Sequence, residues 1–192
     1  MALLSVLQRD WPTEPVDDST FGTAPIVFTT EVVFDAPIKA VWEVFDSDKA
    51  WEWLPFSWLR LCGAGVRYTT PHRGVDAVRE MGTVHGIWRV FWIEHEKFWR
   101  YEPHKRVSYG VASSNWMQHL FVRQYAEHLW FDEAGDGRTL VTWQIALRLR
   151  GPFRIGHLCT PMFRSVYRFA LAQARGQIAT RTAESPVQST AN

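Results

Sequence analysis

The chain has 192 residues, 46% hydrophobic and 21% charged, a composition that suits one globular domain and excludes collagen-like and wholly disordered chains. Its formal net charge of +1 gives no long-range field for holding nucleic acid or an anionic membrane. No apolar run approaches the roughly 20 residues of a membrane-spanning helix. The two cysteines, Cys62 and Cys159, are too few and too widely separated for a disulfide framework or a cysteine zinc site.

The start of the chain lacks the basic residues of a secretory signal and reaches Asp10 early. We therefore expect a cytoplasmic protein. The seven histidines show neither the i, i+4 spacing of a helical zinc site nor a neighbouring cysteine at ligand spacing, so we expect no metal and no cofactor. The 11 Trp and 12 Phe residues indicate either a wide core or a cavity walled by rings.

Residues 1–24 are expected to form an extension, either a linker or an arm on the surface, because prolines and acidic residues interrupt any apolar period. On this pattern they should be dispensable for folding. A strand rich in β-branched residues follows at 26–37. Helical spacing then predicts a short helix up to about Phe45, with Pro37 in its first turn, and a second short helix over 48–54.

The period then changes to that of strands. Six strand-like runs follow, at 57–68, 75–84, 87–102, 105–113, 117–133 and 138–150. The Gly-Asp-Gly turn within 133–138 predicts a hairpin. The last run alternates apolar and polar residues, which is typical of a sheet with one buried face.

From Gly151 onward the pattern is helical. The expected helix covers about 161–180, with Thr160 as its N-cap. Its apolar stripe consists of Phe163, Val166, Tyr167, Ala170, Ala174 and Ile178. The tail, 183–192, is small and polar and is expected to be flexible. The order of elements predicts an α+β fold, in which a long antiparallel sheet packs against one long helix.

Three segments carry a family resemblance: 31–55 with its Ala-Pro and Val-Trp helix, 96–111 with its acidic and aromatic strand, and the Gly-Asp-Gly hairpin with the strand and helix after it. Over about 26–180 the chain resembles the START-like helix-grip superfamily (SRPBCC), in particular its polyketide cyclase/dehydrase and lipid-transport group. The resemblance implies a curved seven-stranded antiparallel sheet around a long C-terminal helix, with two short helices after the first strand. It places a ligand-binding domain at 25–182, with a deep cavity between sheet and helix.

Three functions stay open, because fold alone does not choose among them. The first is binding or transport of a hydrophobic small molecule, such as a lipid, polyketide, isoprenoid or steroid-like compound. The second is a cyclase, aromatase or dehydratase acting in the same cavity, and the third is a protein-interaction module with a filled core. A homodimer is also left open.

Residues expected to face the cavity are Tyr109, Phe121, Trp143, Ile145, Phe163 and Tyr167. If the strand at 117–133 turns the matching face inward, His119 becomes a proton donor or acceptor, and Arg123 or Tyr109 could hold an oxyanion. With the opposite parity or a bulge, His119 and Arg123 are solvated.

The Glu94-His95-Glu96 run places both carboxylates on one face of a strand. Facing solvent they are ordinary surface residues. Facing inward, one would lose its hydration and its pKa would rise, as a general acid or base requires.

Overall fold

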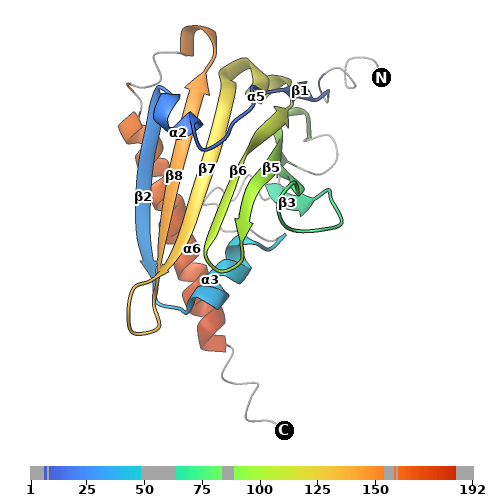
Figure 1. Cartoon of the computed structure of the whole chain (residues 1–192). Coiled ribbons are helices and arrows are strands. Elements are labelled where there is room, and N and C mark those ends of the chain that lie inside the picture. The colour runs from blue at the N-terminus through green and yellow to red at the C-terminus, as the bar shows by residue number, and fades with distance from the viewer. Residues whose placement is uncertain are drawn as a thin grey trace.

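One antiparallel sheet and the long helix α6 (Thr160–Glu184) dominate the structure (Figure 1). The computed structural model describes residues 7, 9–48, 64–83, 89–153, 158 and 160–184. Seven strands follow the order β2-β8-β7-β6-β5-β4-β3, and an eighth, β1, pairs with β6. The strands are β1 (Trp11–Pro12), β2 (Ile26–Phe34), β3 (Ala64–Tyr68), β4 (Val78–Thr83), β5 (Ile93–Glu102), β6 (Arg106–Ser114), β7 (Val122–Glu133) and β8 (Thr139–Leu149). The helix-grip architecture is confirmed, with one strand more than expected.

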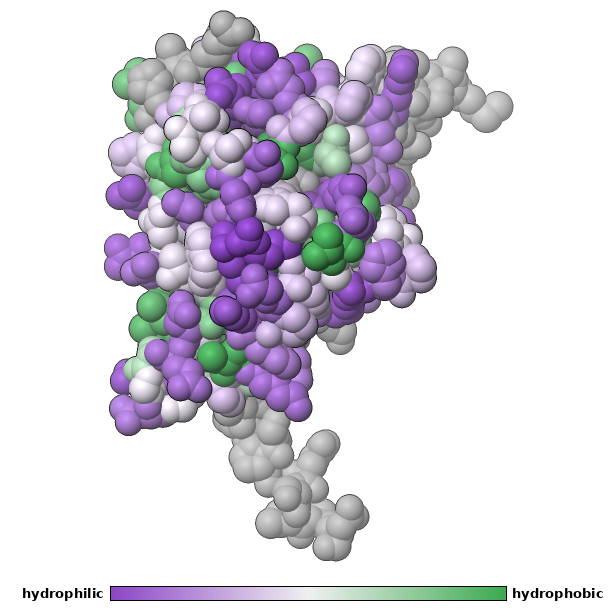
Figure 2. Space-filling view, in the orientation of Figure 1, coloured by the Kyte–Doolittle hydropathy of each residue, from purple (hydrophilic) through white to green (hydrophobic). Residues whose placement is uncertain are grey.

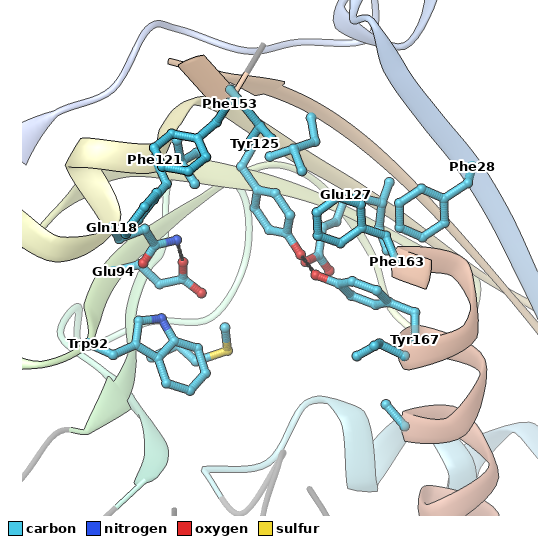
Figure 3. A pocket seen from close by; sticks show the side chains of 17 residues that line it. Phe28, Trp92, Glu94, Gln118, Phe121, Tyr125, Glu127, Phe153, Phe163 and Tyr167 are labelled. Carbon is cyan, nitrogen blue, oxygen red and sulfur yellow. Dashed lines mark hydrogen bonds between the residues drawn. The ribbon is translucent and has the colours of Figure 1, made fainter. Parts of the chain in front are cut away.

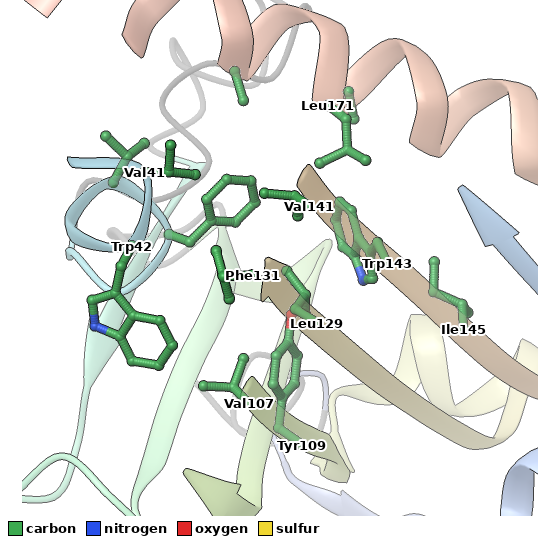
Figure 4. Close-up of a cluster of buried hydrophobic side chains, with 14 of the residues drawn as sticks. Val41, Trp42, Val107, Tyr109, Leu129, Phe131, Val141, Trp143, Ile145 and Leu171 are labelled. Atoms are coloured by element: carbon green, nitrogen blue, oxygen red, sulfur yellow. The ribbon is translucent and has the colours of Figure 1, made fainter. Parts of the chain in front are cut away.

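Alternating residues of β8 form the centre of the core. Val141, Trp143 and Ile145 are all 0% exposed, as the alternation of this strand predicts. Figure 4 shows Leu171 of α6 lying over Val141 and Trp143, so that sheet and helix share one packed interior. Turn chemistry fixes the hairpin that leads into β8, because Gly135, Asp136 and Gly137 all adopt positive φ values, between 54° and 76°.

Helix α6 buries one face from Ala170 onward, at Ala170, Leu171, Ala174 and Ile178. Burying large side chains such as Leu171 and Ile178 stabilises the fold by about 1.5–3 kcal/mol each. The predicted stripe is wrong at Val166, which is 49% exposed. The physical reason is that the first turns of α6 border a cavity rather than packed side chains.

The first of the two expected short helices is α3 (Ile38–Phe45), which begins after Pro37. Its buried residues include Val41, Trp42 and Phe45, the three that the helical spacing singles out. The second short helix, expected at 48–54, lies outside the described residues except for Asp48.

The run at 117–133 is not a single strand. Its first part is the helix α5 (Trp116–Phe121), and only from Val122 onward does it continue as β7. Asn115 at the start of α5 is buried, and its side-chain amide donates hydrogen bonds to the carbonyl oxygens of Arg89 and Val90. These bonds hold the end of β6 against the segment before β5, so the chain turns through a helix before it returns as β7.

The N-terminal segment lies on the sheet face opposite α6, where β1 pairs with the end of β6 (Figure 1). Close approach of the segment depends on Gly110 in β6, because a Cβ built there would lie 2.2 Å from Cγ2 of Val16. This outer face of the molecule is mostly hydrophilic (Figure 2). Of the two readings of this segment, the structure therefore has an arm that contributes a strand.

The arm also covers His128 of β7. Phe21, in the short helix α2 (Thr20–Thr23), stacks on the imidazole with a centroid separation of 3.8 Å. His128 is 4% exposed, and its Nδ1 lies 2.7 Å from Oγ of Ser108. Burial, followed by the charge of Arg106, lowers the pKa of His128 to about 4.

Candidate functional site

A cavity of about 490 Å³ lies between the inner face of the sheet and the first half of α6 (Figure 3). Its walls are mainly aromatic and aliphatic, with a few polar side chains among them. The lining residues are Phe28, Met81, Trp92, Glu94, Gln118, Phe121, Val122, Tyr125, Glu127, Ile145, Leu147, Leu149, Phe153, Phe163, Val166, Tyr167 and Ala170.

The cavity opens to solvent between α5, the turn at 151–153 and the start of α6. Phe121, Phe153 and Val166 line the cavity and are also 38%, 42% and 49% exposed. The rings of Phe121 and Phe153 meet edge to face at a centroid separation of 4.7 Å. An apolar molecule entering here would meet apolar side chains before it reached the interior.

Four of the six residues expected to face the cavity do line it: Phe121, Ile145, Phe163 and Tyr167. Trp143 and Tyr109 do not. Both are almost fully buried in the core, and each donates a hydrogen bond to the carboxylate of Glu127, which is itself part of the cavity wall. They therefore contact the cavity wall by their hydrogen bonds to that carboxylate and do not line the cavity themselves. That the four lining residues bind a ligand stays a prediction.

The three residues suggested for catalysis do not converge in the cavity. His119 lies on α5 rather than on a strand and stacks on Trp11 of the arm. Arg123 follows at the start of β7, where its guanidinium pairs with Glu14 at 2.5 Å, also on the arm. The shared strand face expected for His119 and Arg123 does not exist, because the chain changes from helix to strand between them.

Glu127 of β7 is the centre of the polar part of the wall and is 1% exposed. Its Oε2 accepts hydrogen bonds from Tyr109 and, at 2.7 Å, from Nε1 of Trp143, while Oε1 accepts one from Tyr125. The hydroxyl of Tyr125 also contacts that of Tyr167 on α6. Figure 3 shows these two hydroxyl groups meeting in front of Glu127.

Burial, followed by the charge of Glu96, raises the pKa of Glu127 to about 7. The hydrogen bonds from Tyr109 and Tyr125 favour the ionised form and oppose this rise. Glu127 therefore changes its charge close to neutral pH, and its charge adds to burial in raising the pKa of Tyr125 and Tyr167.

Glu94 and Glu96 of β5 both face inward, the less ordinary of the two readings that the alternation allows. Glu94 is 2% exposed and lines the cavity, where Nε2 of Gln118 donates a hydrogen bond to its Oε2. Glu96 is 0% exposed and forms a salt bridge with the buried Arg79. Burial raises the pKa of both carboxyl groups, and the charge of Glu96 raises that of Glu94 further.

Sequence reasoning missed Glu127, Gln118 and Trp92. Glu127 had a usable signal, because Tyr125, Leu129 and Phe131 share its strand parity and an acid among them must be buried with partners. Gln118 had none, since it lies on an unexpected helix, and Trp92 stands directly before β5, within a run that was expected to be one strand over 87–102.

Among the residues that the structure describes, no group of three His, Cys, Asp or Glu side chains is arranged to hold a metal ion. Within the same residues, no helix is both long and apolar enough to cross a membrane.

The model of the family described as "Polyketide cyclase / dehydrase and lipid transport" matches residues 25–178. No curated protein matches the chain.

Solved structures with the same fold include a protein from Nitrosospira multiformis, with a TM-score of 0.55 at 16% identity over 82% of this chain and 99% of that one. Ara h 8.0201 has a TM-score of 0.57 at 14% identity, over 80% and 97%. Norcoclaurine synthase from Thalictrum flavum, solved with dopamine and hydroxybenzaldehyde, has a TM-score of 0.54 at 14% identity, over 89% and 96%. At these identities the likeness concerns the fold.

Proposed function

The chain belongs to the polyketide cyclase, dehydrase and lipid-transport family, and from this premise we propose that its cavity binds one apolar small molecule of the lipid, polyketide, isoprenoid or steroid-like kind. The observation that carries the proposal is the cavity itself. Its volume of about 490 Å³ falls within the roughly 300–1,000 Å³ typical of small-molecule sites.

The composition of the wall supports an apolar ligand. Most of the lining side chains are aliphatic or aromatic, and the polar ones are few and held by hydrogen bonds to one another. Transfer of apolar surface from water into such a space is favourable by about 25 cal/mol per Å². The exposed Phe121, Phe153 and Val166 mark the route by which the ligand would enter.

Catalysis in the same cavity is the second candidate function, and the buried carboxyl groups favour it. Glu94 and Glu127 both line the cavity, and the pKa of each is raised. Buried acids of this kind are suited to proton transfer. A cyclase or dehydratase of this chain would therefore use Glu94 and Glu127 in place of His119 and Arg123.

The binding proposal is tested by filling the cavity. Ala170 is buried in the wall formed by α6, so Ala170→Phe should occupy the space that the ligand needs. Ala172 on the same helix is exposed, and Ala172→Phe makes the same chemical change on the solvent side. The measurement is a fluorescence titration with Nile red, a neutral apolar dye, together with the melting temperature of each variant.

We expect the wild type and Ala172→Phe to bind the dye with similar affinity, and Ala170→Phe to lose at least about tenfold in affinity while remaining folded. Equal binding by both variants would place the dye elsewhere. No binding by the folded wild type would contradict the proposal.

A further inference from the structure

The polar groups of the cavity wall form two sets that face each other across the space (Figure 3). One set is Glu94 with Gln118, on β5 and α5. The other is the hydroxyl pair of Tyr125 and Tyr167, in front of Glu127. Between them the wall is apolar, so each set is available to a polar atom of a bound molecule.

The two carboxyl groups differ in how well their partners satisfy a negative charge. Glu127 accepts hydrogen bonds from three donors. Glu94 accepts one, from Gln118, and no described residue forms a hydrogen bond with its Oε1. Glu94 also lacks a cation, because Arg79, the one buried lysine or arginine among the described residues, is paired with Glu96.

A buried carboxylate without a cation, beside other carboxylates, is unfavourable, and the group keeps its proton instead. The charges of Glu96 and Glu127 both oppose the ionisation of Glu94. Arg79 and the amide of Gln118 favour ionisation but do not outweigh burial, so the pKa of Glu94 lies well above its ordinary value.

In the amide orientation that the structure shows, the hydrogen bond from Gln118 also indicates where the proton of Glu94 lies. Since Oε2 accepts from the amide Nε2, Oε2 acts as the carbonyl oxygen of the neutral acid. The proton is then on Oε1, where no described residue accepts it. Neutral Glu94 therefore presents a hydrogen-bond donor to the cavity, held in place by Gln118.

Building on the proposed function, we infer that the apolar ligand carries a carbonyl oxygen and that neutral Glu94 binds it by donating a hydrogen bond from Oε1. A buried donor left without a partner costs free energy, so a ligand with an acceptor at this point is preferred over one without. The structure thus assigns a carbonyl-binding subsite to Glu94 and Gln118. A ligand of pure hydrocarbon would leave it empty.

The test compares benzophenone with diphenylmethane, which differ only in that a carbonyl replaces a methylene group. Both are titrated by displacement of Nile red from the wild type, from Glu94→Gln and from Glu94→Leu. Glutamine retains an N–H donor at this position but does not titrate, whereas leucine retains only the volume. The titrations are repeated over a series of pH values, because burial raises the pKa of Glu94 well above its ordinary value.

While Glu94 is neutral, at the acidic end of the series, we expect the wild type to prefer benzophenone by about tenfold. The preference should shrink as the pH is raised and Glu94 ionises and loses its donor. Glu94→Gln should keep the preference throughout the series, and Glu94→Leu should lose it while still binding diphenylmethane.

Equal affinity of the wild type for the two compounds, or an unchanged preference in Glu94→Leu, would overturn the subsite and leave the binding function standing. Failure of the folded wild type to bind either compound or the dye would overturn the binding function itself.

Discussion

The indole Nε1 of Trp143 donates a 2.7 Å hydrogen bond to Oε2 of Glu127, and this bond joins the packed core to the cavity. Trp143 is 0% exposed and belongs to the core, while Glu127 lines the cavity. The ring of Tyr167 meets the indole edge to face at a centroid separation of 4.9 Å and separates it from the open space. The position of the Glu127 carboxylate in the cavity wall therefore depends on how Trp143 packs in the core.

Removal of this indole should destabilise the protein strongly. Trp143→Ala leaves a void in a packed core and one donor fewer at Glu127, and changes of this kind cost about 3–5 kcal/mol. The free energy of unfolding, from urea denaturation followed by circular dichroism, measures the loss. Trp130→Ala on the neighbouring strand, where the side chain is only half-buried, is the control and should cost less. A loss below about 1 kcal/mol for Trp143→Ala would show that the site is not packed.

Glu127 should make stability depend on pH. Its pKa is about 7 in the folded protein against an ordinary value of 4.5, so the folded state binds more protons than the unfolded state between these values. The contribution of Glu127 to the free energy of unfolding is therefore present below about pH 4.5 and is lost as the pH rises through about 7. Urea denaturation between these values should show a smaller fall in stability for Glu127→Gln than for the wild type. If the free energy of unfolding changed equally with pH in Glu127→Gln and in the wild type, the raised pKa of Glu127 would be contradicted.

The cavity-lining and the core-facing side chains of α6 should respond differently to substitution. Leu171 is 0% exposed against the core, and Leu171→Ala should cost about 2–5 kcal/mol. Val166→Asp places a charge at the half-exposed mouth of the cavity, and we expect it to cost less than about 1 kcal/mol while weakening the binding of Nile red. Thermal melts of both variants measure the loss of stability, and a titration of Val166→Asp with Nile red measures the loss of binding. Unfolding of Val166→Asp would show that this turn of α6 packs against the sheet.

The arm should contribute to stability, although its composition alone suggests that it is dispensable. Deletion of residues 1–24 removes β1, uncovers His128 and breaks the 2.5 Å salt bridge between Asp18 and Arg100. We expect a lower melting temperature. The pKa of His128, followed by NMR, should rise from about 4 towards its ordinary value of 6.5. An unchanged melting temperature together with an unchanged His128 titration would contradict a docked arm.

Much of the fold could be predicted because its elements are long and periodic. Alternation over 138–150 predicts the buried face of β8, and the spacing of Ala170, Ala174 and Ile178 predicts the buried face of α6. Helix α5 could not be predicted in the same way, because six residues are too few for a helical period to stand out from a strand-like run. Because this helix was mistaken for the start of a strand, His119 was expected on a strand.

The cavity itself could not be predicted from residue patterns, since an unfilled volume depends on how β5, β7, β8 and α6 meet. Patterns do indicate which residues face inward, and Ile145, Phe163 and Tyr167 were found in this way, whereas Phe121 was expected on a strand and lines the cavity from α5. Patterns do not tell Ile145, a core residue that also lines the cavity, from Trp143, a core residue on the same face of the strand that does not. Only the position of α6 above them makes that difference.

Binding of a ligand in the cavity is best measured by native mass spectrometry of the wild type and of Ala170→Phe, each incubated with a lipid extract of cells and then separated from unbound material. We expect the wild type to retain a single apolar small molecule per chain and the cavity-filling variant to retain none. A wild-type chain that stays bare, or equal adducts on both proteins, would contradict binding in the cavity.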